Sequence, residues 1–337
     1  MMGYVIPFLL GLVPVFLFLA SLILLDSFKL VTFRSILVAV LVGFAAAAAS
    51  FLANTALLTH LPIEGGTYSR YVAPFVEEFW KAAYLIYLVA SKRTGFMVDA
   101  AIYGFAIGAG FAAIENIYFL NALSNPDLVI WFVRGLGTAV MHGGTTAILA
   151  IVSQGIAERG SAGAWRTFLP GLAIAMIIHS TFNHFILPPI VSTAVLVIFL
   201  PVFMMAAFRQ SEASTRQWLG VGLDTDVELM QALTDGSFSE SHIGQYLKSL
   251  RENFRGEIVA DMLCLIRIRT ELAIKAKAML MMKEAGFNPE PDPELQDKFT
   301  ELKYLEKSIG RTGQLAIAPV LHTSNRDLWQ LQMLGQP

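Results

Sequence analysis

Cysteine is almost absent from this chain of 337 residues, which contains one, Cys264. A single cysteine excludes an internal disulfide framework and every metal site of the CxxC type. We expect Cys264 to be a small buried thiol. The zinc-protease motif HExxH is also absent, so any metal ligands must come from separate segments of the chain.

Charge is scarce as well: 15% of the residues are charged, whereas 55% are hydrophobic. That balance excludes an ordinary soluble protein. Residues 1–208 hold only 8 of the 26 acidic and 9 of the 24 basic residues. The break predicts a transmembrane domain over 1–208 and a cytoplasmic helical domain over 209–337. Net charge is close to zero in both parts, so nothing indicates nucleic-acid binding.

Long apolar runs fill the first part of the chain. A membrane helix needs about 20 mostly apolar residues, and seven runs approach or exceed that length. They lie near residues 4–25, 35–59, 74–90, 96–122, 129–153, 167–187 and 190–208. The sequence therefore predicts an all-α polytopic membrane protein with about seven transmembrane helices and a C-terminal helical soluble domain. No basic segment precedes the first run, so we expect a retained helix and not a cleaved signal peptide.

Basic residues in the loops predict the orientation, because they favour the cytoplasmic side. Every second loop, and the segment after the last run, carries two of them: Lys29 and Arg34, Lys92 and Arg93, Arg159 and Arg166, Arg209 and Arg216. The intervening loops carry only Arg70. We expect the N-terminus outside and the C-terminal domain in the cytoplasm.

The C-terminal part is amphipathic, with predicted helices over 258–287, ending at Gly286, and over 297–309. Its acidic residues favour a small packed domain over a helix lying on the membrane surface. We find no catalytic constellation there. A regulatory or oligomerising domain is our working hypothesis, and in the second case the protein would be a homo-oligomer.

Ionisable side chains inside the predicted spans are the most informative feature, because each costs a few kcal/mol in lipid unless it is paired, ligating or reactive. Asp99 and Arg134 lie near predicted span ends, and we interpret both as interfacial or snorkelling. His184 receives the same interpretation. The remaining ones lie in four spans, all in the predicted outer half of the bilayer: Glu77, Glu78, Lys81, Glu115, His142 and His179.

The spacing of these residues suggests chemistry. Lys81 follows Glu77 by four residues and Glu78 by three, so it can neutralise one carboxylate and leave the other free. Histidines and carboxylates are natural ligands of a catalytic zinc ion, which leaves one position for water. The same residues also fit a proton relay in an ion-coupled transporter. Gly104 and Gly108 form a GxxxG pattern that fits close helix approach around a site and equally fits ordinary membrane packing.

Four short motifs carry a family resemblance: "EEFWK" (77–81), "FAAIE" (111–115), "HGGTT" (142–146) and "HSTFN" (179–183). They resemble the EExxK and FxxxE motifs and the later histidine-bearing helices of the PrsW family of intramembrane metalloproteases. This family belongs to the superfamily of CAAX-processing and bacteriocin-processing proteases, whose related motifs are EExxxR, FxxxH and HxxxN. Lys81 in place of the arginine and Glu115 in place of the histidine favour the PrsW branch.

The resemblance implies a multi-pass protein of the bacterial inner membrane that cleaves membrane-anchored proteins on the outer side, for example an anti-sigma factor. It implies Glu77 as the general base that activates water, with Glu78 supporting it or pairing with Lys81. It implies His142, His179 and Glu115 as ligands of Zn²⁺, and Asn183 as a residue that orients substrate or stabilises an oxyanion. Two other functions stay open at this point: the transporter, and a receptor or scaffold that has lost catalytic activity.

Overall fold

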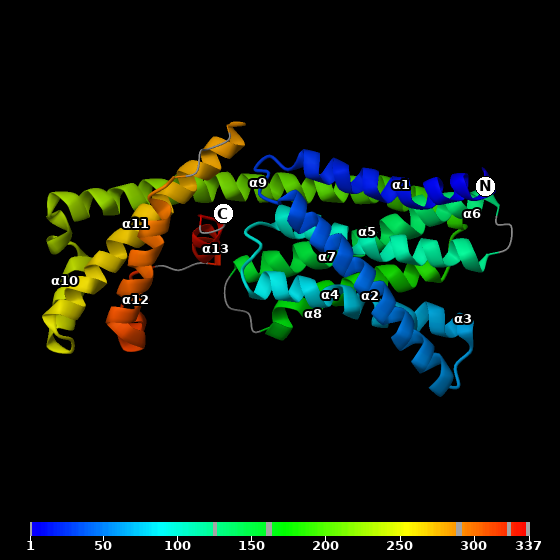
Figure 1. The fold of residues 1–337 in the computed structure, drawn as a ribbon, viewed down its shortest axis with the longest axis horizontal. Coiled ribbons are helices and arrows are strands. Elements are labelled where there is room, and N and C mark those ends of the chain that lie inside the picture. Colours follow the sequence, from blue (N-terminus) through cyan, green and yellow to red (C-terminus); the bar gives the residue numbers. More distant parts are fainter. Residues whose placement is uncertain (1, 124–126, 160–163, 288–291, 322–324, 335–337) are drawn as a thin grey trace. The chain divides into compact units, whose positions relative to one another are not determined.

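The computed structural model describes residues 2–123, 127–159, 164–287, 292–321 and 325–334, and these ranges contain helices and no strand. The chain divides into two compact units, Met1–Glu212 and Ala213–Pro337, and Figure 1 shows the helices of both. Each unit is described by itself.

The first unit contains α-helices of very different length. Two π-helical segments, η1 (Tyr68–Val72) and η2 (Val133–Thr138), lead directly into α4 and α7. The helices are α1 (Met2–Leu25), α2 (Phe33–His60), α3 (Gly65–Thr67), α4 (Ala73–Ala90), α5 (Met97–Ala122), α6 (Leu128–Phe132), α7 (Ala139–Glu158), α8 (Ala164–Asn183) and the first part of α9 (Pro189–Asp235).

Among the described residues, five helical stretches are long and apolar enough to cross a membrane. They are Val5–Leu25, Phe33–His60, Met97–Ala122, Leu128–Glu158 and Pro189–Asp235. The two other predicted spans correspond to α4 and α8, which are helical but do not meet the same test. In α4 the physical reason is clear, because Glu77, Glu78 and Lys81 put three charges into 18 residues.

Helix α5 lies at the centre of the first unit and packs against α1, α2 and α7. It is lined with fully buried alanines, and its glycines allow the neighbouring backbones to approach closely. A Cβ on Gly108 would lie 2.2 Å from the carbonyl oxygen of His142, and one on Gly104 would lie 2.6 Å from that of Thr146. The GxxxG pattern therefore marks the contact of α5 with α7, beside His142.

The second unit has its own core, formed around residues with no exposed surface: Met262, Leu265, Leu272, Ala276 and Leu280. It comprises the end of α9, then α10 (His242–Ser249), α11 (Gly256–Glu284), α12 (Leu295–Ile317) and α13 (Asn325–Leu334), with short 3₁₀ turns at Ser237–Glu240 and Leu250–Glu252. The helices predicted over 258–287 and 297–309 are confirmed as α11 and α12. Gly286, at φ +84°, follows the end of α11.

The expectation of a buried thiol is wrong, because Cys264 is exposed. Met262, Leu265 and Ile266 form the buried stripe of α11. Cys264 falls on the opposite stripe beside the exposed Leu263.

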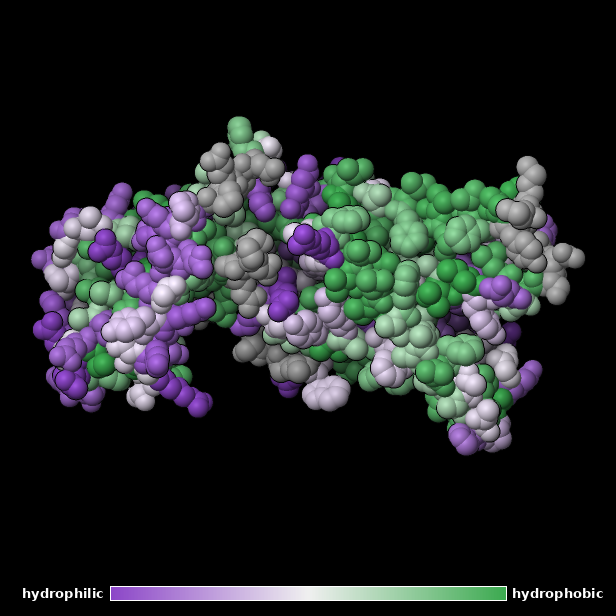
Figure 2. Space-filling model, in the orientation of Figure 1, coloured by the Kyte–Doolittle hydropathy of each residue, from purple (hydrophilic) through white to green (hydrophobic). Residues whose placement is uncertain are grey.

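The two units have different surfaces, and Figure 2 shows hydrophobic side chains over much of the first and mainly hydrophilic ones over the second. In the first unit, α1 and α2 present large apolar side chains outward, such as Leu17, Phe33 and Leu52, which are 64%, 79% and 70% exposed. Such an outward apolar face fits contact with lipid chains.

Candidate metal centre

Helix α4 brings a neutralised carboxylate into the protein interior. Glu78 and Lys81 are both completely buried, and Lys81 Nζ lies 2.5 Å from Glu78 Oε1. The same oxygen accepts a hydrogen bond from Thr145 Oγ1 at 3.1 Å and faces His179 Nδ1 at 2.8 Å. The expectation that Lys81 neutralises one of the two glutamates is confirmed, and the neutralised one is Glu78.

Glu77, the other glutamate, directs one carboxylate oxygen toward the histidines of the site. Its Oε2 lies 3.7 Å from His179 Nε2, and its Oε1 accepts a hydrogen bond from Asn54 Nδ2 of α2 at 3.4 Å. The side chain is 15% exposed. One turn of α4 thus presents two carboxylates in different directions, because consecutive helical side chains diverge by about 100°.

His142 of α7 is held on two sides. Its Nε2 lies 2.9 Å from Glu115 Oε2, and its Nδ1 lies 3.2 Å from Lys81 Nζ. Its ring contacts that of Phe111 and meets the His179 ring edge-on, with centroids 4.9 Å and 4.8 Å apart. Glu115 and Phe111, both in the "FAAIE" motif of α5, therefore form one wall of the site.

Each histidine is oriented by a carboxylate that has its own cation. Glu78, paired with Lys81, faces His179. Glu115, which lies 3.5 Å from Arg134 Nη2, faces His142. A carboxylate that holds one ring nitrogen, as Glu78 holds Nδ1 of His179, is typical of a histidine that binds a metal through its other nitrogen, because it fixes the ring and the tautomer.

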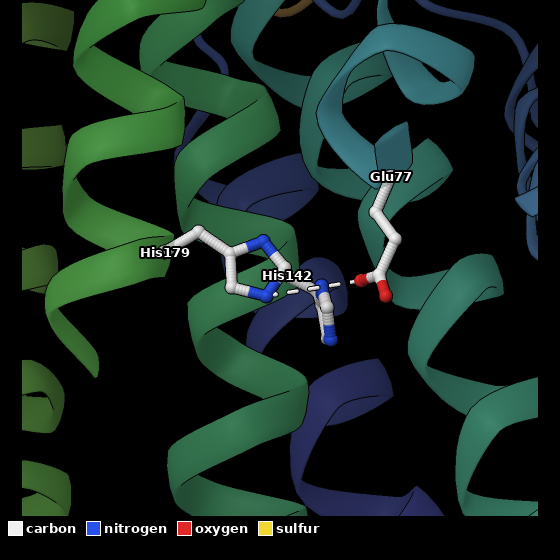
Figure 3. A group of neighbouring side chains, drawn as sticks. All are labelled: Glu77, His142 and His179. Carbon is white, nitrogen blue, oxygen red and sulfur yellow. Dashed lines mark ion pairs between the residues drawn. The ribbon is translucent and has the colours of Figure 1, made fainter. Parts of the chain in front are cut away.

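Among the described residues, one group has donor atoms placed so that they could hold a metal ion: Glu77, His142 and His179. One ligand atom from each lies within 4.8 Å of the other two. Figure 3 shows the three side chains pointing toward one another from α4, α7 and α8. Glu115 is outside this trio, one hydrogen bond away through His142.

The charges of the group fit a bound cation. Three carboxylates, Glu77, Glu78 and Glu115, are matched by two cationic side chains, Lys81 and Arg134. One carboxylate is therefore left over among nearly buried neighbours, which is unfavourable unless a proton or a metal ion compensates it. Nitrogen and oxygen donors of this kind suit zinc. The residues present thus fit a metal ion.

The remaining predicted site residues lie around this centre. Asn183 Nδ2 donates to the carbonyl oxygen of Ser69 at 3.0 Å, so its amide engages η1. His184 contacts the carbonyl oxygen of Ser180 and the ring of Tyr71.

The snorkelling interpretation of Asp99 and Arg134 is wrong. Asp99 is buried and accepts the backbone N–H groups of Gly95 and Phe96 at the start of α5. Arg134 is only 13% exposed and turns inward to Glu115. Both find partners inside the protein, so neither has to reach the membrane surface.

Sequence analysis missed three residues that contact the site: Asn54, Tyr68 and Thr145. Thr145 donates to Glu78, and Tyr68 reaches Glu77 through Asn54. Asn54 had a detectable signal, because it is a polar residue within the apolar run "FLANTALL". Thr145 lies within the quoted "HGGTT" motif but was given no role of its own, and Tyr68 had no signal.

Comparison with known proteins gives a family. Residues 30–207 match the family described as PrsW family intramembrane metalloprotease, so the match covers just over half of the chain. The curated proteins and the solved structures give no match.

Proposed function

Because the chain belongs to the PrsW family of intramembrane metalloproteases, we propose that it cleaves membrane-anchored protein substrates at a zinc ion held among α4, α5, α7 and α8. The observation that carries this proposal is the convergence of Glu77, His142 and His179. Family membership and this geometry together favour proteolysis over ion transport. The resemblance to family members that cleave a membrane-bound anti-sigma factor makes such a signalling protein our candidate substrate class.

We assign the metal to His142, His179 and Glu115. The ion would supply Lewis-acid polarisation and a water molecule made acidic enough to lose its proton near neutral pH. Glu115 Oε2 and His142 Nε2 are already neighbours at 2.9 Å. Arg134 holds the Glu115 carboxylate in place.

Glu77 is the general base in this proposal. It is the carboxylate left without a cation of its own, and its Oε2 faces His179 Nε2. Oε2 would take the proton of the attacking water and return it to the nitrogen of the leaving amine. Glu78 cannot take this part as readily, because Lys81 keeps it neutralised.

The test is proteolysis of a single-span substrate by the purified full chain in detergent or liposomes. We expect cleavage that a chelator stops and zinc restores. Glu77→Gln, His142→Ala and His179→Ala should each abolish cleavage while the protein remains folded by gel filtration. Wild-type turnover in Glu77→Gln would refute the assignment of Glu77 as the base. Cleavage that continues unchanged in the presence of a chelator would refute the requirement for a metal ion.

Zinc content separates the base from the ligands. We expect about one zinc per chain in the wild type, an unchanged content in Glu77→Gln, and a loss of zinc in Glu115→Gln. The reverse pattern would make Glu77 the third ligand in place of Glu115.

The proposal also includes the topology. With α4 and α8 added to the five apolar helices, seven segments would cross the membrane, with the N-terminus outside and the C-terminal domain in the cytoplasm. Glu77 would then lie in the outer half of the bilayer, and cleavage would occur toward the outer face. The C-terminal domain remains a proposed regulatory or oligomerising element.

A further inference from the structure

A chain of two hydrogen bonds reaches Glu77 from outside the sequence motifs. The Tyr68 hydroxyl donates to Asn54 Oδ1 at 2.8 Å, and Asn54 Nδ2 donates to Glu77 Oε1 at 3.4 Å. Tyr68 is 2% exposed, so its hydroxyl is largely shielded from water. The three residues come from η1, α2 and α4.

The direction of this chain is fixed by chemistry. An ionised carboxylate only accepts hydrogen bonds, so Asn54 must present its NH₂ group to Glu77. Its amide oxygen then faces Tyr68, whose hydroxyl is the donor. The phenol thereby holds the amide in the one orientation that serves the carboxylate.

The consequence for Glu77 is that its two oxygens differ. Oε1 is held by Asn54, and Oε2 is turned to His179 Nε2. A glutamate on a helix has several rotamers, and most of them would carry the carboxylate away from the histidines. The contact with Asn54 favours the rotamer that faces the site.

Tyr68 is itself held by α8, the helix that carries His179. Ser180 Oγ donates to the carbonyl oxygen of Arg70 at 2.7 Å, and Asn183 Nδ2 donates to that of Ser69 at 3.0 Å. The segment η1 is thus tied to α8 through its backbone and to α2 through Tyr68. The segment η1 therefore contacts both the helix that carries His179 and, through Asn54, the side chain of Glu77.

We propose that Asn54 and Tyr68 are positioning residues for Glu77: Tyr68 orients the Asn54 amide, and Asn54 holds Oε1 so that Oε2 faces the site. This inference rests on the proposed function, in which Glu77 is the base. It assigns a role in the reaction to α2 and η1, which carry none of the family motifs.

The activity test uses Asn54→Leu, Tyr68→Phe and the double variant. We expect kcat to fall roughly tenfold in Asn54→Leu, the lower end for one hydrogen bond to a charged group, and by less in Tyr68→Phe, whose hydrogen bond joins two neutral groups. KM and zinc content should stay unchanged, because the substrate and the metal ligands are untouched. The double variant should lose no more than Asn54→Leu alone, since Tyr68 acts only through Asn54.

Matched controls come from the same segments. Thr55→Val removes a hydroxyl next to Asn54. The Thr55 hydroxyl donates a hydrogen bond to the carbonyl oxygen of Phe51, within α2 itself. Tyr71→Phe removes the other phenol of η1, on a side chain that is 63% exposed. Both should retain wild-type kcat, and an equal loss in the controls would overturn the inference.

A second measurement does not depend on catalysis. Thermal unfolding of the chelator-treated protein should show non-additive losses for Asn54→Leu and Tyr68→Phe, because the two side chains share one hydrogen bond. Additive losses, or no loss in either variant, would overturn the positioning role. If instead the variants show the non-additive unfolding but the wild type shows no chelator-sensitive cleavage, the hydrogen-bonded chain stands and the proposed function fails.

Discussion

Charge balance determines how the acidic residues of this membrane site are tolerated. Lys81 offsets Glu78, and Arg134 offsets Glu115, while no Lys or Arg among the described residues pairs with Glu77. In a low-dielectric interior, an unpaired carboxylate is strongly unfavourable. The imbalance at Glu77 is therefore the residue-scale signature of a group that works on a bound cation or on a proton.

Arg134 provides the first prediction at this scale. Its Nε donates to Asn116 Oδ1 at 2.9 Å, its guanidinium lies 3.8 Å from the centre of the Phe119 ring, and its Nη2 faces Glu115. Arg134→Met should therefore free Glu115 to leave His142. We expect a loss of roughly tenfold or more in kcat/KM, because removing one partner of this largely buried ion pair leaves the other charge uncompensated.

The control for Arg134 is the Glu115→Gln background. If the arginine acts through the carboxylate, Arg134→Met should add little to the loss already caused by Glu115→Gln. Zinc competition against a chelator should show the same non-additivity. Full independence of the two losses would mean that Arg134 supports the fold and not the site.

The residues that sequence analysis predicted share one property: their charge or imidazole is conspicuous in an apolar run. Glu77, Glu78, Lys81 and His142 were found in that way, and helical spacing predicted that Lys81 could pair with one of the two glutamates but not with which one. Asn54 and Tyr68 were missed because their contacts with each other and with Glu77 arise only when α2 packs against η1 and α4. Arg134 was misjudged because a span end does not reveal which way a long side chain turns.

Helices and their junctions explain how the motifs converge. A π-helical segment precedes each of the two helices that carry Glu77 and His142, namely η1 before α4 and η2 before α7. A π turn inserts extra residues into a helix and rotates the side chains that follow, and such turns are frequent at functional sites. Hydrophobic periodicity predicts where a span lies but does not show such a shift, so neither π-helical segment could be predicted from it.

Gly108 supplies a prediction at the scale of elements. A Cβ there would meet the backbone of His142 and Gly143, at 2.2 Å from the carbonyl oxygen and 2.7 Å from Cα. Backbone atoms cannot rotate away, so Gly108→Ala must push α5 and α7 apart beside the site. Overpacking of this kind costs about 1–3 kcal/mol, and we expect a lower unfolding temperature together with weakened zinc binding.

Gly155→Ala is the matched control for that change, in α7 itself. Its Cβ would meet only the Sδ atom of Met97 at 3.3 Å, at the end of a flexible side chain. Gly155→Ala should leave the unfolding temperature and the zinc affinity close to those of the wild type. Equal effects of the two substitutions would indicate that helix content, and not the α5–α7 approach, determines the loss.

On the scale of the whole molecule, the composition break of the sequence and the division of the structure fall close together, near residues 209 and 213. Helix α9 is continuous across this boundary from Pro189 to Asp235. All the charged residues of α9 lie from Arg209 onward, so only the first part of the helix is apolar enough to lie in lipid.

The orientation of the whole chain is testable because the protein has one cysteine and that cysteine is exposed. Cys264 lies on α11, in the domain expected in the cytoplasm. A membrane-impermeant maleimide should therefore modify the wild type in inverted vesicles and leave it unmodified in intact spheroplasts. Cys264→Ser should not react in either preparation.

The opposite reporter is Gly66→Cys in the Cys264→Ser background. Gly66 is exposed, lies between α2 and α4, and has only Glu64 Oε1 near its Cβ position, at 3.9 Å. We expect the cysteine at position 66 to react in spheroplasts. The segment between α2 and α4 that contains it has few basic residues and should face outward. Modification of Cys264 in intact spheroplasts would show that the topology is the reverse of the one proposed. The Glu77 site would then lie in the inner half of the bilayer, and cleavage would release its product on the cytoplasmic side.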